Sequence, residues 1–129
     1  MRALVYRVQD KEGRGPWHPG FSHRWVEDRP DHENLGPIYA DPGCPDMGCL
    51  TGFVAYGVAC RTVEQLRRWF TPSEYAKLCM FGYQCVSMYA DRVMFDTGTQ
   101  CLFGRMLPLR FDAMPVDLYH QEGADHEQG

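Results

Sequence analysis

Two helix-start signals placed back to back constrain the fold of this chain more than any other feature of its sequence. Residues 62–65 are Thr-Val-Glu-Gln and residues 71–74 are Thr-Pro-Ser-Glu. In this capping-box pattern the threonine hydroxyl accepts a hydrogen bond from a backbone N–H of the first helical turn, and the Gln or Glu side chain reaches back. Proline costs nothing at the first helical position, and Gly82 is a typical helix end. The sequence therefore predicts a short helix over 62–70 and a second one between Thr71 and Gly82.

Runs of β-branched and aromatic residues on both sides of these helices predict strands. They cover residues 3–8, 51–58, 83–90, 100–105 and 107–111. Two glycines in the second run indicate a bulge or a close approach of another group to the backbone. The order of strand, long loop, strand, two helices and further strands predicts an α+β domain. We expect a small mixed or mainly antiparallel sheet with the two short consecutive helices on one face.

Residues 18–49 are the least regular part of the chain, with five prolines and four glycines. Proline fixes φ and removes a hydrogen-bond donor, so neither a long helix nor a central strand fits. We expect a long irregular loop here, which is either a functional flap or a passive insertion. Residues 1–119 are expected to form a single globular domain of ordinary length. Residues 120–129 contain no large apolar side chain, so we expect a flexible acidic tail.

The net charge of −4 argues against one class of partner. An acidic domain is not suited to hold a phosphate backbone along its length, so we expect no direct nucleic-acid binding. No apolar run is long enough to cross a membrane, and the N-terminus has no apolar stretch of signal-peptide length. We therefore expect a cytoplasmic protein without a membrane partner, whose six cysteines are reduced.

A metal site is the first chemistry to consider. Cys44 and Cys49 lie five residues apart in a turn, and His32 is the nearest histidine. A structural zinc needs a second ligand pair nearby, and the other four cysteines lack paired ligand spacing, so we expect no metal. Nothing in the sequence links a particular histidine to a cysteine nucleophile. Three of the four cysteines at positions 60, 79, 85 and 101 lie on apolar faces, where core packing as small hydrophobes is the preferred interpretation.

Two groups of residues are candidates for contact with a partner. Arg61, Arg67 and Arg68 lie on or beside the first predicted helix, near Trp69, which we expect to be exposed. Arginine and tryptophan are enriched among the residues that anchor interfaces. The second group belongs to the long loop and consists of Trp25, Glu27, Asp28, Asp31 and Glu33. The alternative for both groups is that their charged side chains simply cover a solvated helix face and a solvated loop.

Several short stretches resemble a family of small proteins that is common in bacteriophages and prophages. They are Val-Tyr-Arg-Val at 5–8, Gly-Pro-Trp at 15–17, Thr-Val-Glu-Gln-Leu at 62–66, Trp-Phe at 69–70, and residues 100–103. The resemblance implies an accessory protein that works in the host cytoplasm. Such a protein inhibits a host defence complex, as anti-CRISPR proteins do, by binding a host protein or ribonucleoprotein complex. It needs no cofactor for this.

That family is distantly similar to ADP-ribosyltransferase-like folds, which implies an alternative function with NAD as cofactor. In such folds an arginine or histidine on the first strand holds NAD, and a late strand carries a catalytic glutamate. Arg7 matches the first position and Gln100 the second. Glutamine cannot supply the carboxylate that stabilises a developing cation. A structural arginine paired with a loop carboxylate is therefore the preferred interpretation of Arg7. A non-enzymatic structural or regulatory domain is the third alternative.

Overall fold

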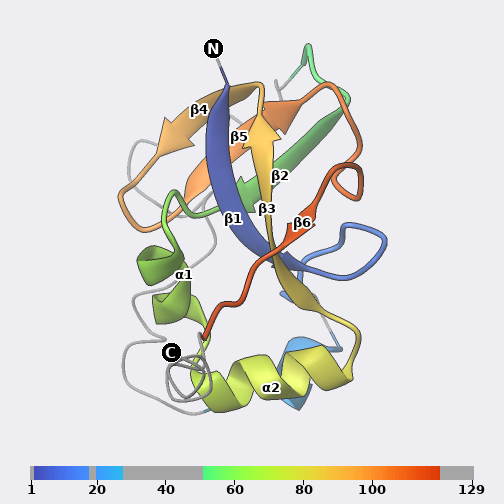
Figure 1. Cartoon of the computed structure of the whole chain (residues 1–129), viewed down its shortest axis with the longest axis vertical. Coiled ribbons are helices and arrows are strands. Elements are labelled where there is room, and N and C mark those ends of the chain that lie inside the picture. Colours follow the sequence, from blue (N-terminus) through green and yellow to red (C-terminus); the bar gives the residue numbers. More distant parts are fainter. Residues whose placement is uncertain (1, 18–19, 28–50, 120–129) are drawn as a thin grey trace, which may run out of the picture.

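The computed structural model of the chain describes residues 2–17, 20–27 and 51–119. Strands, one 3₁₀ turn and two helices follow one another in the order shown in Figure 1. Within the described part no helix is long and apolar enough to cross a bilayer. The elements are β1 (Ala3–Gln9), the 3₁₀ turn (Ser22–Arg24), β2 (Ala55–Ala59), α1 (Val63–Trp69), α2 (Pro72–Met80), β3 (Gln84–Ala90), β4 (Arg92–Asp96), β5 (Cys101–Arg105) and β6 (Met114–Pro115).

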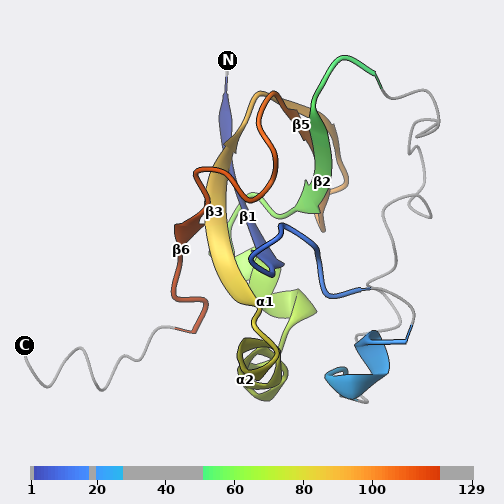
Figure 2. The same cartoon turned by 90° about the vertical axis from the view of Figure 1, so that its right-hand side faces the viewer.

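The strands form two antiparallel three-stranded sheets rather than the single sheet expected from the sequence. One sheet has the order β1-β3-β6 and the other β2-β5-β4. Figure 2 shows the two sheets as separate layers, with α2 at one end of both. They are joined at two places: Tyr6 and Cys60 exchange backbone hydrogen bonds of 2.8 Å, and only Asp91 separates β3 from β4. The α+β class is confirmed, and the chain passes directly from one sheet into the other.

The space between the sheets is filled by side chains from both layers. Val5, Met88 and Phe103 are at most 2% exposed and belong to one apolar cluster. Val5 pairs with Met88 across β1 and β3, so the two side chains share the inner face of the first sheet. Leu4 pairs with Tyr89 in the same register and therefore lies on the outer face.

A second apolar cluster lies where the helices meet the lower ends of β1 and β3. Leu66 of α1 and Leu78 of α2 pack there with Val8 and Cys85 of the first sheet. Both predicted capping boxes are present, at Thr62 with Gln65 and at Thr71 with Glu74. The helix end predicted at Gly82 is also confirmed. Its φ is +90°, and hydrogen bonds of 2.9 Å (Tyr83 N to Leu78 O) and 3.1 Å (Gly82 N to Cys79 O) close the last turn.

Three strand assignments differ from the sequence prediction. Residues 107–111 form turns instead of a strand, with the Phe111 N–H bonded to the Pro108 carbonyl at 3.0 Å. Proline has no N–H to give to a sheet ladder, which is why this apolar run does not pair. Conversely, β4 and β6 were not predicted. They are five and two residues long and exist because β5 and β3 offer them pairing partners.

Candidate protein-binding surface

Arg7, the residue matched to NAD binding, is buried between the two sheets. Its Nη1 donates to the carbonyl of Val58 in β2 (3.0 Å), and its Nη2 donates to the carbonyl of Gly13 in the loop after β1 (3.1 Å). Burial lowers the pKa of Arg7 to about 10, although nearby Asp10 acts in the opposite direction. The guanidinium therefore ties the loop after β1 to the edge of β2. Two carbonyl groups take the place of the expected loop carboxylate.

Gln100, the residue matched to the catalytic glutamate, lies just before β5 and is 5% exposed. Its backbone carbonyl accepts hydrogen bonds from the N–H (2.9 Å) and the hydroxyl (3.1 Å) of Thr97, which close the turn between β4 and β5. Both Arg7 and Gln100 are thus parts of the packed interior. Neither side chain is presented to a ligand approaching from solvent.

Arg67 holds the end of the described chain against α1 and is not a free cation. Its Nε donates to the carbonyl of Leu118 at 2.8 Å, and its guanidinium lies over the ring of Tyr119. The Tyr119 hydroxyl in turn donates to the carbonyls of Arg67 and Phe70. Leu118 is fully buried in the second cluster. These contacts indicate a structural role for Arg67.

The remaining candidates on or beside α1 differ in how far their side chains are exposed to solvent. Arg61 and Arg68 are exposed, and Nη1 of Arg61 is 3.8 Å from a carboxylate oxygen of Asp96. Trp69 was expected to be exposed, but it is 7% exposed, and its Nε1 donates to the carbonyl of Thr99 at 3.1 Å. The apolar stripe of α1 turns this ring into the core. The patch of arginines around an exposed tryptophan is therefore reduced to Arg61 and Arg68.

Trp25 was proposed as a partner contact, but it is fully buried. Its ring packs edge-on against Trp17 (4.6 Å between centroids) and tilted against Phe70 (5.3 Å). Its Nε1 donates to the carbonyl of Pro16 at 3.2 Å. A large aromatic ring in a loop gains more by filling the core than by facing solvent. Trp25 is a core residue that anchors the segment around the 3₁₀ turn.

Glu27 belongs to a set of contacts at the N-terminus of α2. Its carboxylate accepts hydrogen bonds from the hydroxyls of Thr71 and Ser73 and from Nζ of Lys77 at 3.1 Å. Its backbone N–H donates to the buried carboxylate of Glu74 at 2.7 Å. The hydrogen bonds from Ser73 and Lys77 lower the pKa of Glu27. Asp28, Asp31 and Glu33, the other acidic candidates, lie outside the described residues.

The described thiols fit the interpretation as core residues, except for Cys79, which is exposed. Burial raises the pKa of Cys60 and Cys85 to about 12 and that of Cys101 to about 11. A protonated thiol is a poor nucleophile and a poor metal ligand. The suspected zinc ligands, Cys44 and Cys49 with His32, lie outside the described residues. In the part that is described, no three His, Cys, Asp or Glu side chains gather closely enough to hold a metal.

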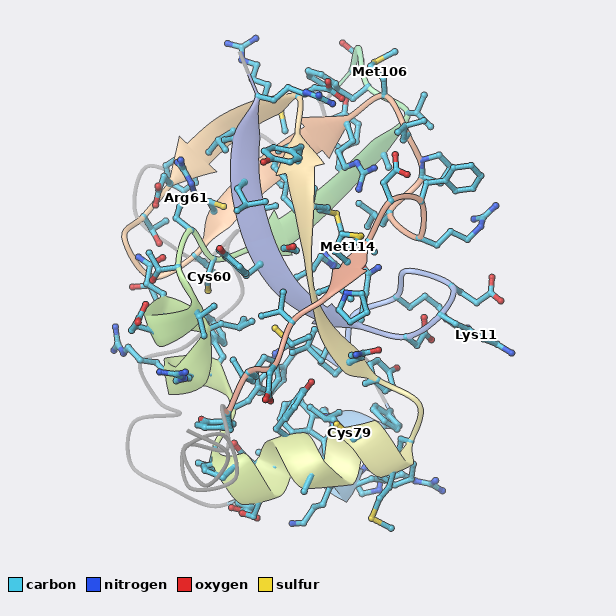
Figure 3. The ribbon with its side chains drawn as sticks, viewed as in Figure 1. Lys11, Cys60, Arg61, Cys79, Met106 and Met114 are labelled. Carbon is cyan, nitrogen blue, oxygen red and sulfur yellow. The ribbon has the colours of Figure 1, made fainter. Side chains whose placement is uncertain are left out.

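Several large apolar side chains that the sequence did not single out are exposed. They are one tyrosine of β3 and four residues of the segment that leads from β5 to β6. Figure 3 shows Met106 and Met114 of this segment, on a different side of the molecule from Arg61. We call this set the apolar surface. It consists of Tyr89 (56% exposed), Met106 (55%), Leu107 (39%), Phe111 (48%) and Met114 (62%).

The register of the first sheet explains why two of these side chains face outward. Tyr89 pairs with Leu4, and Ser87 pairs with Met114. Ser87 and Tyr89 are two residues apart, so Leu4, Tyr89 and Met114 share the outer face of the sheet. The helices cover the lower part of this face at Val8, and no helix of the described residues lies over its upper part (Figure 1).

Arg105 fixes the segment between β5 and β6 in place. It is 2% exposed, and its Nη2 donates to the carbonyl of Phe111 (2.9 Å) while its Nη1 contacts the sulfur of Met88 (2.9 Å). Burial lowers the pKa of Arg105, and the carboxylates of Asp112 and Asp91 act in the opposite direction. The Met106 N–H donates to the Asp91 carboxylate at 2.7 Å. The segment is therefore anchored by its backbone, which leaves its apolar side chains exposed.

A hollow of about 140 Å³ lies at one end of the apolar surface. An apolar cavity of similar size holds a benzene-sized group. The volume of the hollow is that of about one side chain. Its walls are partly apolar and partly charged, and they are formed by Arg2, Tyr89, Asp91, Arg105, Met106, Leu107 and Asp112.

Comparison with known proteins gives a match to a protein family. The family model described as bacteriophage T4 Y00F protein matches residues 1–117. No curated protein and no solved structure matches the chain. The match covers every described element from β1 to β6, including the apolar surface. It ends just before Leu118 and Tyr119, which Arg67 holds against α1.

Proposed function

The chain belongs to the bacteriophage T4 Y00F protein family, and we propose that it is a phage accessory protein that inhibits a host defence complex by binding a macromolecular surface. In this mode of action it resembles an anti-CRISPR protein. The family makes it a phage protein. The apolar surface is the observation that supports the proposed binding function, and a protein component of the host complex is the proposed partner.

The physical argument starts from the cost of exposing large apolar groups. Each buried Å² of apolar surface contributes about 25 cal/mol, so five large side chains left exposed forgo several kcal/mol unless they are covered by a partner. Contiguous exposed apolar patches typically mark interaction sites. Tyrosine and methionine are also enriched at such sites, the first as a rigid anchor and the second as an adaptable contact. Tyr89, Met106 and Met114 supply both kinds.

The alternative enzyme hypothesis receives less support from the structure. Arg7 and Gln100 are both buried, and the guanidinium of Arg7 already donates to two backbone carbonyls. Arg61 and Arg68 remain secondary candidates for partner contact, because both side chains are exposed, Arg61 just before α1 and Arg68 within it.

The proposal is tested by expressing the chain in the bacterial host and measuring the efficiency of plating of a challenge phage. We expect plating to rise on a strain with an active defence system and to stay unchanged on a strain without it. Tyr89→Ser combined with Met114→Ser should abolish the rise, because a central aromatic anchor of an interface can contribute about 2 kcal/mol and loss of the Met114 contact adds to this. Circular dichroism must show that the variant is folded.

The matched control is Arg61→Glu combined with Arg68→Glu, which alters the exposed cations near α1. It should leave the effect on plating unchanged if the apolar surface alone binds the partner. If the control abolishes the effect and the Tyr89 and Met114 variant does not, the binding surface lies at α1. No change in plating on any defence-proficient strain would contradict the proposed inhibition.

A further inference from the structure

The pairing between β3 and β6 covers only part of the edge of β3. Ser87 lies opposite Met114 in an antiparallel register. Two residues further along β3 and two residues before Met114, the same register would place Tyr89 opposite Asp112. Asp112 is not extended, however, because its φ is +57°. The chain therefore turns away from β3 at the point where its next pair would form.

The backbone N–H and C=O of Tyr89 point toward this open edge. Tyr6 exchanges its backbone hydrogen bonds with Cys60, on the side away from β3. Because bonds alternate between the two sides of a strand, Ser87, which is opposite Tyr6, and Tyr89 both direct their N–H and C=O toward β6. In the described part of the chain no hydrogen bond reaches either backbone group of Tyr89. One donor and one acceptor of β3 are thus left for a partner.

The hollow lies at the same place. Tyr89 and Asp112, the two residues that do not pair, both belong to its walls. The charged residues of the walls are two arginines and two aspartates, so no net charge selects a charged ligand. The distinguishing feature is the pair of free backbone groups beside the exposed ring of Tyr89. An extended backbone, which offers one acceptor and one donor at each alternate residue, matches such a pair.

From this arrangement we propose that the partner protein binds by strand addition. An extended segment of the partner continues the line of β6, antiparallel to β3, and one of its residues exchanges two backbone hydrogen bonds with Tyr89. The side chain of that residue lies beside the Tyr89 ring on the outer face, where a β-branched or aromatic residue packs well. Proline is excluded at this residue because it has no N–H. This inference rests on the proposed function, because it assigns a mode of recognition to the same surface.

The first measurement is amide hydrogen exchange of the nitrogen-15-labelled full chain, followed by NMR. In the free chain we expect the Tyr89 amide to exchange faster than the Met88 amide, which is paired with Val5 in β1. Short random peptides are then selected against the immobilised full chain, and we expect β-branched and aromatic residues to be enriched. A selected peptide at about ten times its Kd should slow the exchange of the Tyr89 amide about tenfold.

N-methylation of the selected peptide, one residue at a time, separates backbone pairing from side-chain contact. Methylation of the residue opposite Tyr89 should weaken binding about tenfold in fluorescence anisotropy, because it removes one hydrogen bond and obstructs the other. Methylation of either neighbouring residue, whose N–H points away from β3, should change binding less than about twofold.

A matched pair of variants at position 112 tests the open edge from the side of the chain. Asp112→Val favours an extended backbone, because a β-branched residue rarely adopts a positive φ, and the chain's own segment should then pair with Tyr89. Asp112→Gly removes the same carboxylate but keeps the positive φ accessible. We expect the peptide to bind Asp112→Val at least about fivefold more weakly than Asp112→Gly.

The outcomes separate strand addition from the proposed function. Failure to enrich any peptide overturns the inference, and so does a Tyr89 amide that is already protected in the free chain; if that protection rises with chain concentration, the occupant is a second copy. Suppose that a selected peptide responds to no single N-methyl group but loses binding with Tyr89→Ser and Met114→Ser. The apolar surface then stands, and strand addition is wrong. If the peptide binds these variants as tightly as the natural chain, both the inference and the proposed surface fail.

Discussion

The buried side chain of Arg7 restricts which residue can occupy position 57 in β2. Its guanidinium lies against β2, where a Cβ on Gly57 would be 2.7 Å from Nη1 of Arg7 and 2.8 Å from the ring of Phe103. Real Cβ atoms do not approach other atoms so closely. Phe103 is fully buried and Arg7 is held by Val58, so neither has room to move away. Glycine at position 57 is therefore required for the contact between the two sheets.

We predict that Gly57→Ala lowers the free energy of unfolding by about 2 kcal/mol, the usual cost of overpacking a filled core. Gly15→Ala is the matched control, because a Cβ there would lie at an ordinary distance of 3.5 Å from Nη2 of Arg7. We expect the control to change stability by less than about 0.5 kcal/mol. Urea denaturation followed by tryptophan fluorescence measures both. Equal effects of the two substitutions would show that Arg7 and Phe103 can shift.

At the residue scale the sequence reveals alternation but not which face is buried. The strand pattern places Val5 and Arg7 opposite Leu4 and Tyr6, and the structure confirms this division. An arginine on one face suggests that this face is the solvated one, whereas here it is the inner face. Burial of Arg7 depends on carbonyl groups of Val58 and Gly13, and the position of β2 beside β1 is not encoded in the local pattern.

At the scale of elements, α2 is held at its first turn by a residue far away in the sequence. Glu27 accepts hydrogen bonds from Thr71, Ser73 and Lys77, and its carboxylate is close to the positive end of the helix. The same contacts connect α2 to the segment that contains the buried Trp25. One charged side chain thus joins a helix to an irregular segment without contributing to the apolar core.

Glu27→Gln tests this junction through its pH dependence. Because the folded state lowers the pKa of Glu27 from its ordinary value of 4.5, the charged form stabilises the fold above that pH. The stabilisation disappears as the pH falls below about 4.5, where the unfolded chain takes up the proton first. We therefore expect the natural chain to be more stable than the variant at pH 7, and the difference to shrink progressively as the pH falls below about 4.5.

The measurement is the midpoint of urea denaturation of both proteins at a series of pH values. Glu64→Gln is the control, because Glu64 is an exposed acid in the first turn of α1. A difference between the natural chain and Glu27→Gln that stays constant from pH 7 to pH 3 would mean that the carboxylate charge does not hold the junction.

Elements encoded by local signals could be predicted, and those that depend on distant pairing could not. Each helix start rests on two side chains within four residues, so both capping boxes are visible in the sequence. In contrast, β6 has two exposed residues and forms only because β3 lies beside it. The run at 107–111 has strand-like composition, yet Pro108 and the anchor provided by Arg105 keep it in turns.

The candidate site escaped prediction for a reason that belongs to the whole molecule. Met106, Phe111 and Met114 look like core residues in the sequence, and only the arrangement of the two sheets shows that no element among the described residues covers them. The opposite holds for Trp25 and Trp69: the sequence suggested that they belong to a partner-binding surface, but both fill the core. Whether an apolar side chain is covered depends on the completed fold, so residue type alone does not identify a binding surface.

Three thiols distributed over both apolar clusters make the stability of the whole molecule sensitive to alkaline pH. Cys60 and Cys85 lie in the cluster next to the helices, and Cys101 lies between the sheets. Burial raises their pKa values from the ordinary 9 to about 12, 12 and 11, respectively. At pH values between the ordinary pKa and these raised pKa values, the unfolded chain has lost the thiol protons and the folded chain has kept them. The stabilisation that comes from the three protonated thiols is therefore fully present below pH 9 and is lost as the pH rises above 9.

We expect the free energy of unfolding to fall between pH 8.5 and pH 10 by up to about 1.4 kcal/mol per pH unit for each thiol. Urea denaturation in the presence of a reductant measures this slope. Cys85→Ala should make the slope shallower, whatever it does to the stability at neutral pH, because one titrating group has been removed. A flat profile for the natural chain would contradict the burial of all three thiols and, with it, the packing of the helices and both sheets around them.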